Sequence, residues 1–199
     1  MAVYTISNTG GNWNSLTSWL VGGVTPAALP GAADTVVAAA TSGNLTLTDN
    51  RSIAGVNFTN YVNTFTINSG TTLTCSGAFT LVAAMGVAGT GTLSLTVGGQ
   101  TITSAGKTWT GSLNFTTGAT SITFTLGDAW IVNGNLTGTG AAGTLNINSN
   151  SITVRGNWTI GTSTGSINFY GTTIIIIAPL ISTTSTISSS CLLYTSPSP

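Results

Sequence analysis

Short segments that alternate apolar and polar residues recur along this chain, and they constrain its fold more than any other feature. Two clear examples are TFTINSGTTLTCSGAFTL, from Thr64, and TLNINSNSITVRGNWTI, from Thr144. Each holds an alternating pair, an Asn-Ser turn, a second alternating run, and an aromatic residue followed by threonine. Alternation with a period of two predicts strands that bury one side. We therefore expect an all-β protein built from repeats.

Looser copies extend the pattern, and we place the repeat starts at Thr64, Thr92, Ser121, Thr144 and Ser166, so that successive starts differ in number by 28, 29, 23 and 22. Periods of roughly 20 to 30 residues are typical of solenoids. A unit of two or three short strands cannot bury its apolar side alone, but units stacked at ~4.8 Å can share a narrow core. The pattern favours a parallel β-solenoid. A β-sandwich, which also has short strands joined by frequent turns, is the alternative.

The scarcity of charge agrees with stacked strands. Charged residues make up 3% of the chain and hydrophobic residues 41%, whereas about 25% charge is typical of globular domains. Disorder is a poor explanation, because disordered chains combine low hydrophobicity with high charge. Stacked like charges would repel, whereas stacked threonines can hydrogen-bond along the ladder. We expect the hydroxyl side chains to lie outside.

We divide the chain into a cap with the first strands (1–60), irregular solenoid repeats (61–182) and a non-native or disordered tail (183–199). The last nine residues, CLLYTSPSP, resemble a translated sequencing adapter, since TGT CTC TTA TAC ACA TCT CCG AGC CCA encodes them. A natural Pro/Ser-rich tail is the alternative. The adapter interpretation implies that the natural chain continues beyond Ser190.

The opening segment carries a further pattern, GNW…W…G…P…D.V, between Gly10 and Val37. It resembles the start of many β-helical bacterial surface proteins and phage-associated structural proteins. The resemblance implies a cap, in which the indoles of Trp13 and Trp19 cover the open end of the first coil. Two core tryptophans beside an ordinary turn are the alternative.

The chain lacks the residue clusters that catalysis needs. Its acids are Asp34, Asp49 and Asp128, it has no Glu, and it has no His to activate a serine. Glycosidases need paired carboxylates, but these three lie apart beside turn-forming residues, so we expect turn roles. We expect Cys75 to be a small buried side chain. The sequence predicts no enzyme, no cofactor and no metal site.

Charge and hydropathy also limit the partners. The three basic residues, Arg51, Lys107 and Arg155, cannot form a phosphate-binding stripe, so we expect no nucleic acid. No apolar run reaches the ~18 residues of a membrane helix, so we expect no membrane insertion. The start, MAVYTISNTGG, shows no signal peptide.

Two features could bind a ligand. Thr-x-Thr pairs would place both hydroxyls on one side of a strand, as in several ice-binding solenoids; they are Thr46/Thr48, Thr64/Thr66, Thr72/Thr74, Thr101/Thr103, Thr108/Thr110 and Thr123/Thr125. Aromatic residues could stack on the sugar rings of a cell-surface glycan if exposed, or fill the core; they are Trp109, Trp130, Trp158 and Tyr170.

These observations favour a non-catalytic structural and display protein, a solenoid segment of a phage tail fibre or another virion appendage. We expect a homo-oligomer, for which a trimer is one form, located in a virion or outside the cell. The alternatives are a secreted bacterial adhesin or surface repeat protein, and an ice- or glycan-binding solenoid.

Overall fold

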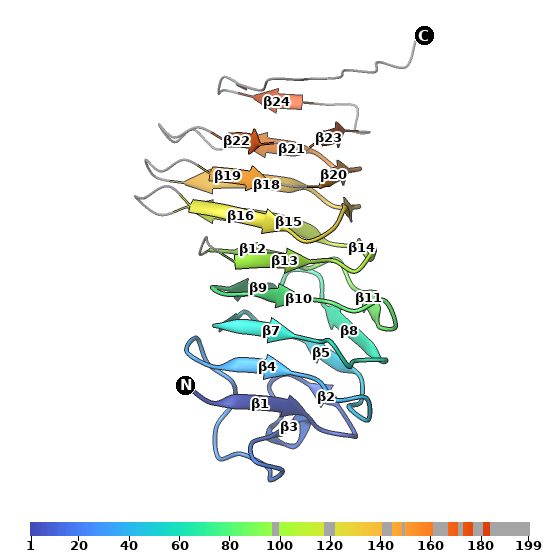
Figure 1. Ribbon diagram of the computed structural model, residues 1–199. Coiled ribbons are helices and arrows are strands. Elements are labelled where there is room, and N and C mark those ends of the chain that lie inside the picture. Colours follow the sequence, from blue (N-terminus) through green and yellow to red (C-terminus); the bar gives the residue numbers. More distant parts are fainter. Residues whose placement is uncertain are drawn as a thin grey trace.

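The computed structural model is an all-β stack whose strands lie one above another, with the N-terminus at one end (Figure 1). The structure describes residues 1–96, 100–117, 122–140, 145–148, 150–160, 167–170, 173–176 and 181–183. Neighbouring strands pair in parallel throughout the stack, apart from one antiparallel pair at the N-terminal end. The prediction of a parallel β-solenoid is confirmed, and the β-sandwich is wrong. The tail from residue 184 onward lies outside the described residues.

The chain visits three faces in turn, so each coil after the first contributes one strand to each. Face I is a nine-stranded sheet: β3 (Trp19–Leu20), β1 (Val3–Ile6), β4 (Thr35–Val37), β7 (Gly55–Asn57), β10 (Phe79–Thr80), β13 (Gln100–Thr103), β16 (Ile122–Leu126), β19 (Leu145–Asn148) and β22 (Ile167–Tyr170). Face II consists of two four-stranded sheets: β2 (Gly11–Asn12), β5 (Leu45–Leu47), β8 (Thr64–Ile67) and β11 (Gly86–Ala88), then β14 (Thr108–Trp109), β17 (Trp130–Val132), β20 (Ser151–Val154) and β23 (Thr173–Ile176). Face III has seven strands: β6 (Arg51–Ile53), β9 (Thr72–Cys75), β12 (Thr92–Leu95), β15 (Ser112–Thr117), β18 (Leu136–Gly140), β21 (Trp158–Ile160) and β24 (Ile181–Thr183).

The length of one coil is the difference in number between residues that pair across it, and it varies little once the stack is established. On face III, Leu73 pairs with Leu93, a difference of 20. On face I, Ile102 pairs with Leu126, a difference of 24. Only the first coil is longer, because residues 11–34 form the N-terminal end between β1 and β4.

The predicted repeat starts do not all share a face. Thr64 begins β8 on face II and Thr92 begins β12 on face III, whereas Ser121, Thr144 and Ser166 each precede a strand of face I. The last two spacings between these starts are therefore one coil each. The first two spacings each equal one coil plus the step from one face to the next. The repeat starts predicted at Thr64 and Thr92 therefore lie at different points of the coil from the three later starts, and these two boundaries are wrong.

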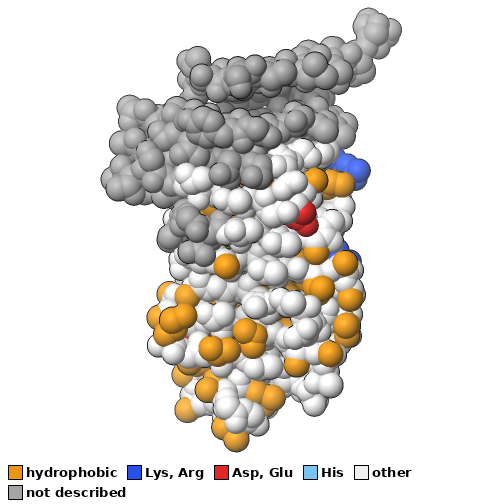
Figure 2. Space-filling model, in the orientation of Figure 1, with side chains coloured by type: hydrophobic (Ala, Val, Ile, Leu, Met, Phe, Trp, Pro, Cys, Tyr) orange, Lys and Arg blue, Asp and Glu red, His pale blue; other side chains and the backbone are white. Residues whose placement is uncertain are grey.

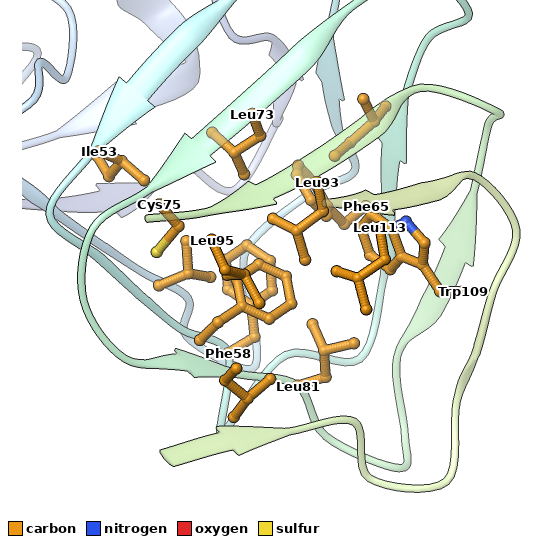
Figure 3. Packing of buried hydrophobic residues seen from close by; sticks show 14 of the residues in the cluster. Ile53, Phe58, Phe65, Leu73, Cys75, Leu81, Leu93, Leu95, Trp109 and Leu113 are labelled. Atoms are coloured by element: carbon orange, nitrogen blue, oxygen red, sulfur yellow. The ribbon is translucent and has the colours of Figure 1, made fainter. Parts of the chain in front are cut away.

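The core consists of columns of apolar side chains that run through the coils. One column on face III holds Leu73, Leu93, Leu113 and Leu136, and the next holds Ile53, Cys75, Leu95 and Phe115. Figure 3 shows members of both columns lying over one another. All eight side chains are buried, and each such aliphatic or aromatic side chain contributes roughly 1.5–3 kcal/mol relative to exposure.

From β4 onward, the corners between faces I and II become shorter along the stack. Seven residues (38–44) join β4 to β5, six (58–63) join β7 to β8, and three (127–129) join β16 to β17. The opposite trend holds between faces III and I, where one residue joins β6 to β7 and three (76–78) join β9 to β10. The coil length is thus nearly constant, but the position of each turn within the coil changes along the chain. This change makes the repeat hard to recognise in the sequence.

The N-terminal end is built by an indole pair and a reversed strand. Trp13 and Trp19 are fully buried, and their rings meet edge to face at 4.8 Å. The Trp19 Nε1–H donates to the Trp13 carbonyl at 2.7 Å, and β3 pairs antiparallel with β1. The strands β4 to β7 already belong to the common stack, so the solenoid begins well before residue 61.

Candidate functional site

The outer surface of face III is a regular array of short polar side chains. Its columns follow the register of β9, β12, β15 and β18: Thr72, Thr92 and Ser112; then Thr74, Ser94, Asn114 and Thr137; and, continuing the strands, Ser76, Thr96 and Thr116. None of these residues is charged or apolar; Ser94 is buried, and the other members are half-buried. Neighbours lie ~4.8 Å apart across coils and ~6.6 Å apart along a strand, the spacing of two strand residues.

Hydrogen bonds run through this array, both along one strand and between coils. The Asn114 side-chain amide donates to the Thr116 hydroxyl at 3.1 Å and approaches the Ser94 hydroxyl at 3.5 Å. At the adjacent corner, the Asn135 backbone N–H donates to the Ser112 hydroxyl at 3.3 Å. The side chains therefore hold successive coils together and also form a flat neutral surface.

The predicted Thr-x-Thr pairs do not form this array by themselves, because they lie on all three faces. Thr72/Thr74 is on face III, whereas Thr64/Thr66 is on face II and Thr101/Thr103 is on face I. The remaining pairs follow the same division: Thr46/Thr48 and Thr108/Thr110 belong to face II, and Thr123/Thr125 belongs to face I. The array was missed because serine and asparagine replace threonine in TLS and SLN, which follow TLT at intervals of one coil.

The aromatic residues proposed for glycan stacking need correction where the structure describes them. Trp109 and Trp130 are 2% and 1% exposed, so neither can present a ring to a sugar. They form a cluster with Phe79, with ring centroids 6.0 to 6.5 Å apart. Alternation already indicated this for Trp109, since its neighbours were expected to point outward. The side chains of Trp158 and Tyr170 lie outside the described part of the chain.

The aspartates take part in turns. Asp34 accepts hydrogen bonds from the backbone N–H of Ala2 at 2.7 Å and of Gly31 at 3.0 Å, and these bonds hold its pKa below 3.8. Asp128 likewise accepts from the N–H groups of Ser104 and Gly106, at 2.7 and 3.1 Å. Both acids thus tie a turn to the preceding coil.

Among the side chains that the structure describes, the third aspartate and the other ionisable groups give no reactive cluster. Asp49 pairs with Arg51 at the turn before β6. Burial raises the pKa of the Cys75 thiol to about 11, so it stays protonated at neutral pH. Across the described residues, no three His, Cys, Asp or Glu side chains come together as they would around a metal ion. Nor does the described chain contain a helix long and apolar enough to span a membrane.

A column of glycines at the corner between faces II and III was not predicted. Gly91, Gly111, Gly134 and Gly156 lie over one another in successive coils. A Cβ on Gly134 would approach the Gly111 carbonyl oxygen to 2.4 Å, and one on Gly156 would approach the Gly134 oxygen equally closely. The dipeptide Gly-Asn at 134 and 156, one coil apart, was the sequence signal for this column.

Most of the described surface in Figure 2 is neither apolar nor charged, and its hydrophobic side chains are scattered. Face III is uniform over its central strands, since every outward residue there carries a hydroxyl or amide. It is therefore the candidate binding surface. No protein-family model, curated protein or solved structure matches this chain.

Proposed function

We propose that this protein is a non-catalytic structural and display element, a β-solenoid segment of a phage tail fibre or another virion appendage. The observation that supports the proposal is the parallel ladder, which continues through seven strands on face III and eight on face I. Each inner strand is hydrogen-bonded on both sides, so opening one coil breaks pairing with two neighbours. Such a stack suits a rigid spacer.

Display depends on the outer surface of face III. The central coils there carry only neutral hydroxyl and amide groups, such as those of Thr74, Asn114 and Thr137. Flatness and short side chains allow close approach by a receptor or a neighbouring chain, and absence of charge makes that approach independent of ionic strength.

Localisation tests the proposal. Gold-labelled antibodies against the purified chain would be applied to virions and to cells from the culture that carries the gene. Label on a virion appendage is the expected result. Label on the cell envelope, with none on particles, would contradict it and favour the secreted adhesin.

A second candidate, ice binding, is favoured by the two-dimensional regularity of the same face. A thermal-hysteresis assay tests it, with Thr74→Lys on face III and Thr101→Lys on face I as the matched pair. Ice binding requires hysteresis in the parent chain that only the face III substitution abolishes. Absence of hysteresis in the parent chain removes this candidate.

A further inference from the structure

At the N-terminal end of the stack, the chain itself covers the edges of faces I and II. On face I, β3 pairs antiparallel against β1. At the free edge of β2 on face II, the Asn12 carbonyl accepts hydrogen bonds from the Ser18 hydroxyl at 2.7 Å and from the Ser15 N–H at 3.0 Å. A further parallel strand would have to displace these contacts.

Face III ends differently. Its last strand at this end is β6, which has β9 on one side and no strand on the other. Arg51 pairs in register with Leu73 and so occupies the first position of the leucine column that continues through Leu93 and Leu113. A basic residue therefore stands where every following coil of that column has a leucine, as far as Leu136.

This arginine is held in an ion pair. Its Nε–H donates to Asp49 Oδ1 at 3.0 Å, and its Nη2 lies 2.5 Å from Oδ2. The side chains are 24% and 42% exposed, and theirs is the one ion pair among the residues that the structure describes. Charged residues that point inward on an edge strand oppose the addition of another strand, because pairing would remove water from the charge.

We propose that the Asp49–Arg51 pair is a stop, which prevents a strand of a second copy of this chain from pairing with β6 and so ends the stack at this edge. The inference goes beyond the proposed function, since it holds for any solenoid with this edge. It explains why two of the chain's few charges lie here.

The test compares Arg51→Leu with Arg155→Leu in the full chain. Both substitutions remove one positive charge. Arg155, however, is exposed at the corner between β20 and β21, in a coil that has a neighbouring coil on each side. We expect Arg51→Leu to form oligomers that grow with concentration, measured by size-exclusion chromatography with light scattering. At equal concentration, their share of the mass should be at least about tenfold larger than in the parent chain, whereas Arg155→Leu should match the parent.

A variant of Arg51→Leu that stays in the parent's state, or an equal rise in Arg155→Leu, would overturn the stop. If Arg51→Leu does not fold, Arg51→Thr decides, because it removes the charge with a residue common in these strands. Arg51→Thr should oligomerise less than Arg51→Leu but more than Arg51→Lys, which keeps the charge. Equal behaviour of the Thr and Lys variants would also overturn the proposal.

Discussion

Each complete coil turns from face I to face II and then from face II to face III, and these two corners are built in opposite ways. The first varies from seven residues to three along the stack, and its longer turns place Phe58 and Tyr61 in the core. The second keeps two to four residues between described strands and, from Gly91 onward, brings glycine over glycine with no room for a Cβ; the first has such a contact only at its start, where a Cβ on Gly43 would lie 2.5 Å from the Gly10 nitrogen. We call these the wide corner and the tight corner. The solenoid tolerates more variation in corner length where side chains fill the space than where backbones touch.

The largest expected effect comes from inserting one alanine at each corner. After Gly134, in the tight corner, the insertion would turn the inward side chains of β18 outward or break the stacking, because strand side chains alternate. We expect a loss of more than about 4 kcal/mol in the free energy of unfolding, which is exceptional for a local change. Urea denaturation followed by circular dichroism measures it.

The matched insertion after Thr59, in the wide corner, should cost about 1 kcal/mol or less, since loop entropy rises slowly with length. Thr59 is exposed. Equal losses at both corners would show that the distinction between them is wrong.

A smaller effect is expected from Gly134→Ala. The added Cβ would meet the Gly111 carbonyl oxygen at 2.4 Å, and relieving such overpacking costs about 1–3 kcal/mol. The control is Gly31→Ala, whose Cβ would meet only Asp34 Oδ2 at 3.7 Å and should change stability by less than about 0.5 kcal/mol. Thermal unfolding of both variants makes the comparison, and a tolerated Gly134→Ala would argue against a tight corner.

The substitution Tyr61→Phe tests how the wide corner is held together. The Tyr61 hydroxyl lies 2.7 Å from the Gly43 carbonyl and 2.9 Å from the Thr64 carbonyl, and it ties two coils together. The hydroxyl has one proton to share between these two carbonyls, and losing that hydrogen bond should cost about 1 kcal/mol, measured by chemical denaturation at pH 7. An unchanged unfolding free energy would mean that the ring alone, packed against Phe58, holds this corner.

The last comparison concerns the pH dependence of stability and uses Cys75→Ala, beside the third corner. In the folded protein the thiol pKa is about 11, above its ordinary 9.0, so the fold retains a proton that the unfolded chain releases. This contribution to stability is complete below about pH 9 and is lost as the pH rises toward 11. The parent chain should lose stability more steeply than Cys75→Ala between pH 9 and 11. Parallel curves would contradict the burial of this thiol.

The sequence predicted the strands and their stacking because both depend on local alternation. The position of the repeat boundaries within a coil could not be predicted, because corner lengths change along the chain. Thr64 and Thr92 therefore fall on different faces. Aromatic character alone left Trp109 open between glycan stacking and the core. Its flanking threonines, Thr108 and Thr110, had already placed it inward under a period of two.

The face III array and the glycine column depend on contacts between residues of neighbouring coils, which are far apart in the sequence. Such contacts become visible in a sequence only after the coil length is known. Once the step from Thr72 to Thr92 is repeated, the next member of the polar column, Ser112, can be read directly from the sequence.

The central claim is that successive coils stack in parallel register, and cross-linking tests it most directly. Thr72 and Thr92 pair across coils on the outside of face III, at a strand separation of ~4.8 Å that suits a disulfide. With Cys75→Ala and Cys191→Ser, the variant Thr72→Cys/Thr92→Cys should form an intramolecular disulfide under mild oxidation. A 64–67/72–75 hairpin closed by residues 68–71 would instead set position 64 opposite Cys75. Failure of the 72–92 cross-link, with ready cross-linking of Thr64→Cys to the native Cys75, would contradict the solenoid.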